Sequence, residues 1–184
     1  DSNGVVLLGT TSSRDAGFAH KLQLEDTGSA PYGISIISNR ADTHASHIDF
    51  AKSRGASIGS NTVVQDGDYL GHLVFRGTDG TDAATVSAAI RVRVDGTPGS
   101  NDIPGRLEFY TSTGGTTYER LRINSAGKVG IGITTPDCKL HIHNGSAGSI
   151  SASSAANLTI ESSASDYNVL QFLSPSTAAQ QIRF

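Results

Sequence analysis

The stretch from Glu119 to His143 constrains the fold most, because its apolar residues come in three short pairs separated by turns. Apolar and polar residues alternate through each pair, which predicts three short β-strands. The segments from Asn124 to Gly127 and from Thr134 to Asp137 have the small and polar residues that favour tight turns. The apolar residues of the three pairs are Leu121, Ile123, Val129, Ile131, Leu140 and Ile142.

These three strands are too short to be stable on their own. Each has two apolar side chains on its inner face, and full burial of one contributes roughly 1.5–3 kcal/mol. That gain does not offset the conformational entropy lost when a strand and its turns become ordered. We therefore expect the strands to pack against stacked copies or neighbouring chains. Gly130 and Gly132 leave one face without side chains, which indicates close approach of another backbone segment.

The string ERLRINSAGKVGIGITTPDCKLHI resembles a segment of bacteriophage tail fibres and related virion fibre proteins, where it lies in the shaft or neck. A looser resemblance runs from Gly67 to Gly80 and from Val94 to Ser112. The resemblance implies a homotrimer of intertwined or side-by-side chains. We expect an all-β fold, with short strands and tight turns in an elongated trimeric β-fibre similar to a β-helix or β-prism. The six apolar residues above would then form the trimer core.

Composition and charge argue against several classes of protein. A net charge of −3 gives no basic surface for nucleic acid, and no apolar run approaches the roughly 20 residues that span a bilayer. The single cysteine, Cys138, excludes an internal disulfide framework. The sequence does not begin with Met and stops at Phe184 within a strand pattern, so we expect it to be a piece of a longer polypeptide.

The block from Leu22 to Phe50 recurs as the block from Leu158 to Phe184, with Glu25 aligned to Glu161. This predicts an internal repeat with a truncated second copy; the alternative is chance similarity between two strand-rich segments. We expect four parts: a β-rich module (1–112, with the first repeat copy at 22–50), a short-strand shaft segment (113–145), a Ser/Ala/Gly-rich connector (146–157) and the start of the second copy (158–184).

A short apolar run predicts a buried strand at Val5–Leu8, and alternating or β-rich segments predict further strands along the chain. These segments are Lys21–Glu25, Gly33–Ser38, His47–Phe50, Asp68–Arg76, Ala88–Val94 and Arg106–Tyr110. The Ala-rich stretch from Ala83 to Ile90 predicts a helical turn before the strand that follows it.

The motif His141-Ile142-His143 is a candidate metal site. Residues i and i+2 of a strand share a face, so a parallel trimer with this face toward its axis would bring six imidazoles together. Six nitrogen ligands suit an octahedral transition metal such as iron or nickel. In the alternative, His141 and His143 face solvent while Leu140 and Ile142 face the core. We predict no other cofactor.

A second polar cluster contains His44 and His47 with Asp42 and Asp49. Its spacing matches no strong zinc pattern, and it falls in a loop that enters a predicted strand. We therefore interpret it as a solvated loop.

Acidic residues elsewhere have simple structural explanations. The loops Asp79–Asp82 and Asp95–Asp102 lack the ligand spacing of a calcium loop, so we interpret them as turns. A glycan hydrolase needs two facing carboxylates. Glu108, Glu119 and Asp102 are candidates, but the strand patterns place both glutamates toward solvent. No nucleophile elbow, Walker loop or dinucleotide fingerprint is present, and we predict no catalytic residue and no enzyme.

These patterns favour a structural component of a phage virion fibre, a trimeric β-rich shaft segment that supports host attachment. Its expected partners are its own copies, other tail or fibre proteins and a host surface glycan or protein, in a virion assembled in the host cytoplasm. One alternative is a receptor- or glycan-binding module that uses the loops Ala41–His47 and Thr78–Asp82. Two others are a fibre-borne polysaccharide depolymerase and a bacterial trimeric adhesin with heptad stalks.

Overall fold

The computed structural model describes residues 4–14, 16–17, 20–28, 33–148, 152–153, 155–163 and 170. These residues form strands, turns and irregular segments, and they contain no helix. Accordingly, none of the described residues belongs to a helix capable of crossing a membrane. The all-β prediction is confirmed, with strands in open sheets; the trimeric β-helix or β-prism arrangement stays a prediction.

The chain divides into two compact units, Asp1–Arg120 and Leu121–Phe184. The first unit begins with β1 (Val6–Leu8) and β2 (Leu22–Leu24), which pair in parallel. Both strands were predicted and are confirmed, but the prediction that the first is buried is wrong, because Val6 and Leu8 are 58% and 53% exposed.

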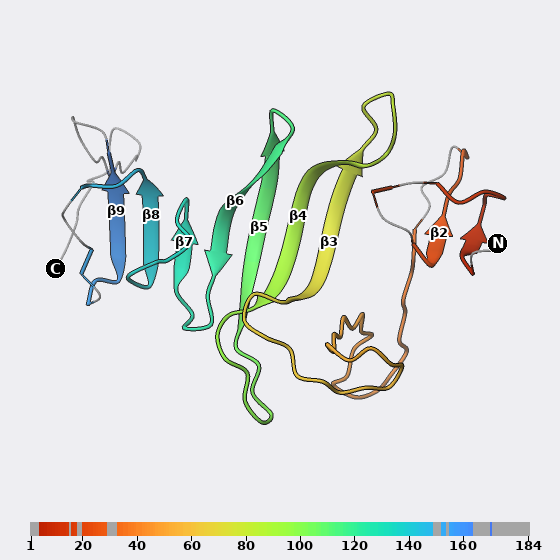
Figure 1. Cartoon of the computed structure of the whole chain (residues 1–184), viewed down its shortest axis with the longest axis horizontal. Coiled ribbons are helices and arrows are strands. Elements are labelled where there is room, and N and C mark those ends of the chain that lie inside the picture. The colour runs from red at the N-terminus through yellow and green to blue at the C-terminus, as the bar shows by residue number, and fades with distance from the viewer. Residues whose placement is uncertain are drawn as a thin grey trace. The chain divides into compact units, whose positions relative to one another are not determined.

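The larger sheet of the first unit follows chain order. Its strands are β3 (Tyr69–Gly77), β4 (Thr85–Val94), β5 (Gly105–Thr113) and β6 (Thr116–Ile123), drawn in yellow to green in Figure 1. The β3–β4 and β4–β5 pairs are antiparallel. The three strands predicted over Asp68–Arg76, Ala88–Val94 and Arg106–Tyr110 are therefore confirmed.

The predicted helical turn over Ala83–Ile90 is wrong, because β4 already begins at Thr85. Ala88 lies opposite Phe75 of β3 and opposite Thr111 of β5. Pairing on both sides outweighs the weak helical preference of alanine, since strand preference depends mainly on such neighbours.

A two-residue turn joins β5 to β6. Gly114 and Gly115 have φ values of 57° and 77°, and a type I′ hairpin turn needs positive φ at both central residues. This Gly-Gly pair between two strand patterns is a hairpin signal that the sequence analysis missed.

The two faces of this sheet differ in chemistry. Directly paired residues point to the same face, and the register gives one face the polar residues His72, Arg91, Arg93, Arg106, Glu108 and Tyr110. The other face carries the apolar residues Leu73, Ile90, Val92, Leu107 and Phe109.

The strands predicted over Gly33–Ser38 and His47–Phe50 are wrong, because neither segment belongs to a strand. Their apolar side chains are largely exposed, Ile37 at 78% and Ile48 at 68%. Phe50 lies against β3, where a Cβ added to Gly71 would be 2.8 Å from the Phe50 Cβ. Alternation of apolar and polar residues is compatible with a strand, but a segment joins a β-ladder only where a neighbouring strand pairs with it.

The second unit contains the end of β6 with β7 (Val129–Ile131), β8 (Leu140–Asn144) and β9 (Leu158–Ser162). β7 pairs antiparallel to β6, and β8 and β9 add in parallel. Between β6 and β7, the Gly127 amide donates to the Asn124 carbonyl at 2.9 Å. The three predicted strands and this turn are confirmed, although the first strand is the end of the eight-residue β6 and is not short.

The predicted repeat and the four predicted parts stay predictions. The second copy begins at β9, but residues 164–169 and 171–184 lie outside the described residues. Within the connector, residues 149–151 and 154 also lie outside them, and its described residues form no strand.

The hydrophobic core is small. In the described part of the chain, the buried hydrophobic residues are Val64, Ala89, Val94 and Cys138. Many larger apolar side chains are exposed instead, among them Phe75 at 55% and Val6 at 58%.

Candidate functional site

The six predicted core residues of the second unit lie on one face. The ladder register forms two rows across the strands. One row is Leu121, Ile131, Ile142 and Ile160, and the other is Ile123, Val129, Leu140 and Leu158. We call these the apolar rows. Ile123 and Ile131 are each 38% exposed and Leu158 is 46% exposed, so the face is open. Whether it fills a trimer interior stays a prediction.

The opposite face of these strands is closed by the chain itself. A Cβ added at Gly130 would lie 2.5 Å from the Ile133 carbonyl oxygen, and one at Gly132 would lie 2.3 Å from that of His143. The predicted close approach of a backbone at both glycines is confirmed. Cys138 is buried on this side, where its Sγ lies 3.3 Å from Thr159 Oγ1.

His141 and His143 belong to the closed face, opposite Leu140 and Ile142. His141 is fully buried, which differs from the solvent-facing alternative. Its Nε2 lies 3.0 Å from Glu161 Oε2, and His143 Nε2 lies 4.0 Å from the same oxygen. The backbone N–H of Ala147 donates to Glu161 Oε1 at 2.6 Å. This bond, followed by the neighbouring histidines, lowers the pKa of Glu161.

The axial metal site stays a prediction, but it conflicts with the predicted trimer core. The histidines and the apolar rows point to opposite faces, so only one set can face the axis. The Gly145 amide donates to His143 Nδ1 at 3.4 Å, which leaves the proton of a neutral imidazole on Nε2, the atom nearer Glu161. Among the described residues, no group of three His, Cys, Asp or Glu side chains is arranged for a metal ion.

A charged network covers the polar face of the first unit. Arg106 Nε donates to Glu108 Oε1 at 2.6 Å, and its guanidinium also reaches Asp95 Oδ1 at 3.0 Å. Tyr110 OH lies 3.1 Å from Glu108 Oε2 and 3.1 Å from Glu119 Oε2. Burial and the two carboxylates raise the pKa of Tyr110 to about 12. We call Arg106, Glu108, Tyr110 and Glu119 the arginine–glutamate cluster.

The placement of Glu108 toward solvent was wrong, because its side chain is fully buried. Arg106 and Tyr110 of β5 bond to its carboxylate, and Arg93 of β4 lies 4.0 Å from it. The structure brings Glu108 and Glu119 together through Tyr110, whereas Asp102 is exposed in the loop after β4. The ion pair between Arg106 and the inaccessible Glu108 stabilises the sheet and gives no support for the depolymerase alternative.

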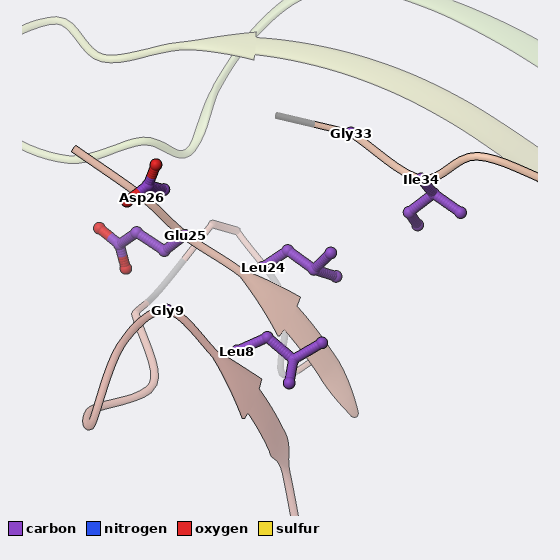
Figure 2. Close-up of a pocket in the computed structure, with 7 residues that line it drawn as sticks. All are labelled: Leu8, Gly9, Leu24, Glu25, Asp26, Gly33 and Ile34. Carbon is purple, nitrogen blue, oxygen red and sulfur yellow. The ribbon is translucent and has the colours of Figure 1, made fainter. Parts of the chain in front are cut away.

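A hollow in the first unit is lined by apolar side chains from β1 and β2 (Figure 2). Leu8, Leu24 and Ile34 border a cavity of about 530 Å³, with Glu25 and Asp26 at its edge. Val6 lies opposite Leu22 as Leu140 lies opposite Leu158 in the second unit. The predicted repeat aligns Leu22 with Leu158, and each of these residues pairs in parallel with an earlier strand.

The predicted binding loops contain local turns. In the loop Ala41–His47, Asp42 accepts the His44 amide at 3.0 Å and pairs with Arg40. In the loop Thr78–Asp82, Asp79 accepts the Thr81 amide at 2.9 Å. Their use in binding stays a prediction.

The sequence analysis missed a basic cavity beside β3. It is lined in part by His20, His72 and Arg76, and Arg91 lies across the ladder from His72. The signal was available in the alternation of Arg91 and Arg93 with Ile90 and Val92, which predicts a basic face on this strand.

No protein-family model and no curated protein matches the sequence. Among solved structures, the fold is similar to the carboxy-terminal domain of the bacteriophage T5 L-shaped tail fibre, with a TM-score of 0.54 and 15% identity. The match covers 82% of this chain and 59% of that chain. The chain therefore has a fold shared with a bacteriophage tail-fibre domain.

Proposed function

We propose that the chain is a structural segment of a phage virion fibre and that it works as a homotrimer. The observation that carries this proposal is the pair of apolar rows, which occupy one partly exposed face of the second unit. The fold shared with a tail-fibre domain agrees with it.

The role is mechanical. Three copies bring their apolar rows together and bury side chains that one copy leaves in water, which stabilises the assembly. Obligate oligomers of this kind often have no stable folded monomer. No catalytic residue or bound cofactor enters this role. The partners are other copies, neighbouring tail proteins and a host surface molecule, in a virion assembled in the host cytoplasm.

The test is the substitution Ile131→Asp. Ile131 lies between Leu121 and Ile142 in one apolar row, and a carboxylate there would be buried without a partner in the trimer. We expect the soluble trimer to disappear in native mass spectrometry. Thr135→Asp is the matched control, because Thr135 is exposed in the turn before β8. A trimer unchanged by Ile131→Asp would contradict the inward-facing rows.

A further inference from the structure

Asn144 and Gly145 form an Asn-Gly dipeptide at the point where β8 ends. Asparagine is a thermolabile residue, because the backbone nitrogen of the next residue can attack its side-chain amide carbon and close a five-membered imide. A following glycine favours this attack, since it has no Cβ to shield its nitrogen. Asn144 is exposed, and among the described residues its side-chain amide has no hydrogen-bond partner. The side chain is therefore free to turn toward Gly145.

The imidazole of His143 lies where a base for this attack is needed. The Gly145 N–H donates to His143 Nδ1 at 3.4 Å, so this ring nitrogen carries a lone pair and can accept the proton. On the other side of the ring, Nε2 lies 4.0 Å from Glu161 Oε2, and this carboxylate stabilises the imidazolium that forms. A nucleophile, a base and a third group beside the base are the parts of an activated nucleophile.

The end of the β8–β9 ladder holds Gly145 in this position. Its φ is 101°, in the left-handed region that favours glycine, and an added Cβ would lie 2.2 Å from Ser163 Oγ. The Asn144 carbonyl accepts the Ser163 amide at 3.3 Å, and Asn144 lies opposite Ser162 in the ladder. The fold therefore requires glycine at position 145 and keeps its nitrogen beside His143.

We propose that Asn144 is a self-modifying site, at which His143 acts as the general base for cyclisation with Gly145. The Gly145 nitrogen gives its proton to His143 Nδ1 and forms a bond to Asn144 Cγ. The bond from Cγ to Nδ2 then breaks, and His143 returns the proton to the leaving nitrogen, which departs as ammonia. Water opens the imide at one of its two carbonyls and leaves an aspartate or an isoaspartate at position 144.

Either product changes the end of the β8–β9 ladder. Isoaspartate lengthens the main chain by one carbon and turns the carbonyl that accepts the Ser163 amide into a free carboxylate. Asn144 shares a strand face with Leu140 and Ile142, so both products add a negative charge at the edge of the apolar rows. The reaction goes beyond the mechanical role, and it does not depend on the trimer because all of its groups belong to one chain.

The experiment follows deamidation of the full folded chain at neutral pH, by peptide-mapping mass spectrometry and an isoaspartate assay. Asn3-Gly4 is an internal reference, because it is the same dipeptide preceded by Ser2 in place of a histidine. We expect Asn144 to convert at least about tenfold faster than Asn3, since a general base contributes a factor of about 10²–10⁴. Conversion of Asn144 that is equal to or slower than that of Asn3 would overturn the proposal.

Variants separate the effect of the base from that of the dipeptide. His143→Gln should slow conversion of Asn144 at least about tenfold and leave Asn3 unchanged. Ser146→Ala is the matched control, because Ser146 lies in the same turn but accepts the amide of Gly148. It should leave both rates unchanged. Equal rates of Asn144 conversion in the folded wild type and in His143→Gln would overturn the role of the base.

The same comparison in urea tests whether the fold positions the base. The unfolded chain does not hold the imidazole against the Gly145 nitrogen, so the difference between the wild type and His143→Gln should disappear. A difference that persists in urea would come from the neighbouring residue in the sequence alone and would contradict a base held by the fold.

Discussion

The polar face of the first unit and the apolar rows of the second unit differ in whether the chain itself provides partners for their side chains. Glu108 is fully buried, yet Arg106 and Tyr110 of the same chain bind both of its oxygens. Ile131 and Leu158 are 38% and 46% exposed, although both are large and apolar. The chain thus provides internal partners for the buried Glu108 carboxylate and leaves large apolar side chains partly exposed, as the proposed assembly requires.

The largest effect on the stability of the chain should come from Glu108→Ala. It removes the buried carboxylate that Arg106 Nε contacts and leaves Asp95 as the remaining carboxylate partner of Arg106. Breaking a buried pair costs up to about 3–5 kcal/mol. We expect a lower free energy of unfolding by that amount in urea denaturation. Asp42→Ala is the control, because the Arg40–Asp42 pair is exposed and should contribute nothing measurable. Equal stabilities of the two variants would show that the cluster does not stabilise the sheet.

A smaller loss is expected from Gly130→Ala, which tests the closed face of the second unit. The added Cβ would lie 2.5 Å from the Ile133 carbonyl oxygen, and such overpacking costs about 1–3 kcal/mol. Gly77→Ala should be close to neutral, because nothing lies within 4 Å of its added Cβ. Thermal unfolding measures both, and equal midpoints would mean that the loop after Gly130 is not held against the strand.

The smallest expected effect is on the pH dependence of the stability of the first unit. Arg54 forms a two-point ion pair with Asp68 at 2.6 and 2.8 Å. This pair, with the Gln65 amide, holds the pKa of Asp68 well below its usual range. Its stabilisation is therefore present above the unfolded pKa of about 3.9 and is lost as pH falls through the folded value. Asp68→Asn should lower the melting temperature at pH 7, and the difference from the wild type should shrink progressively as pH falls below about 4. A difference in melting temperature that does not change with pH would contradict this role of the Asp68 carboxylate.

Local patterns predicted much of the second unit. The turn from Asn124 to Gly127 and the strands on either side depend on neighbouring residues, so alternation and turn chemistry were sufficient. The burial of Glu108 could not be predicted in this way, because it depends on β4 and β6 as neighbours. The juxtaposition of His72 and Arg91 depends on the β3–β4 register, which no local pattern determines.

The failed predictions have the same cause. Gly33–Ser38 has a strand pattern, but the described part of the chain provides no partner strand for it. Ala88 has a helical preference, but strands on both sides hold it in β4. In each case the outcome was decided by neighbours distant in sequence.

The most direct test of the central claim is the mass of the native protein in solution, measured by light scattering across a range of concentrations. We predict a species with three times the 19.1 kDa chain mass that persists on dilution until the protein unfolds. A folded monomer at every concentration would contradict the account, because it would show that the apolar rows are stable in water without a partner.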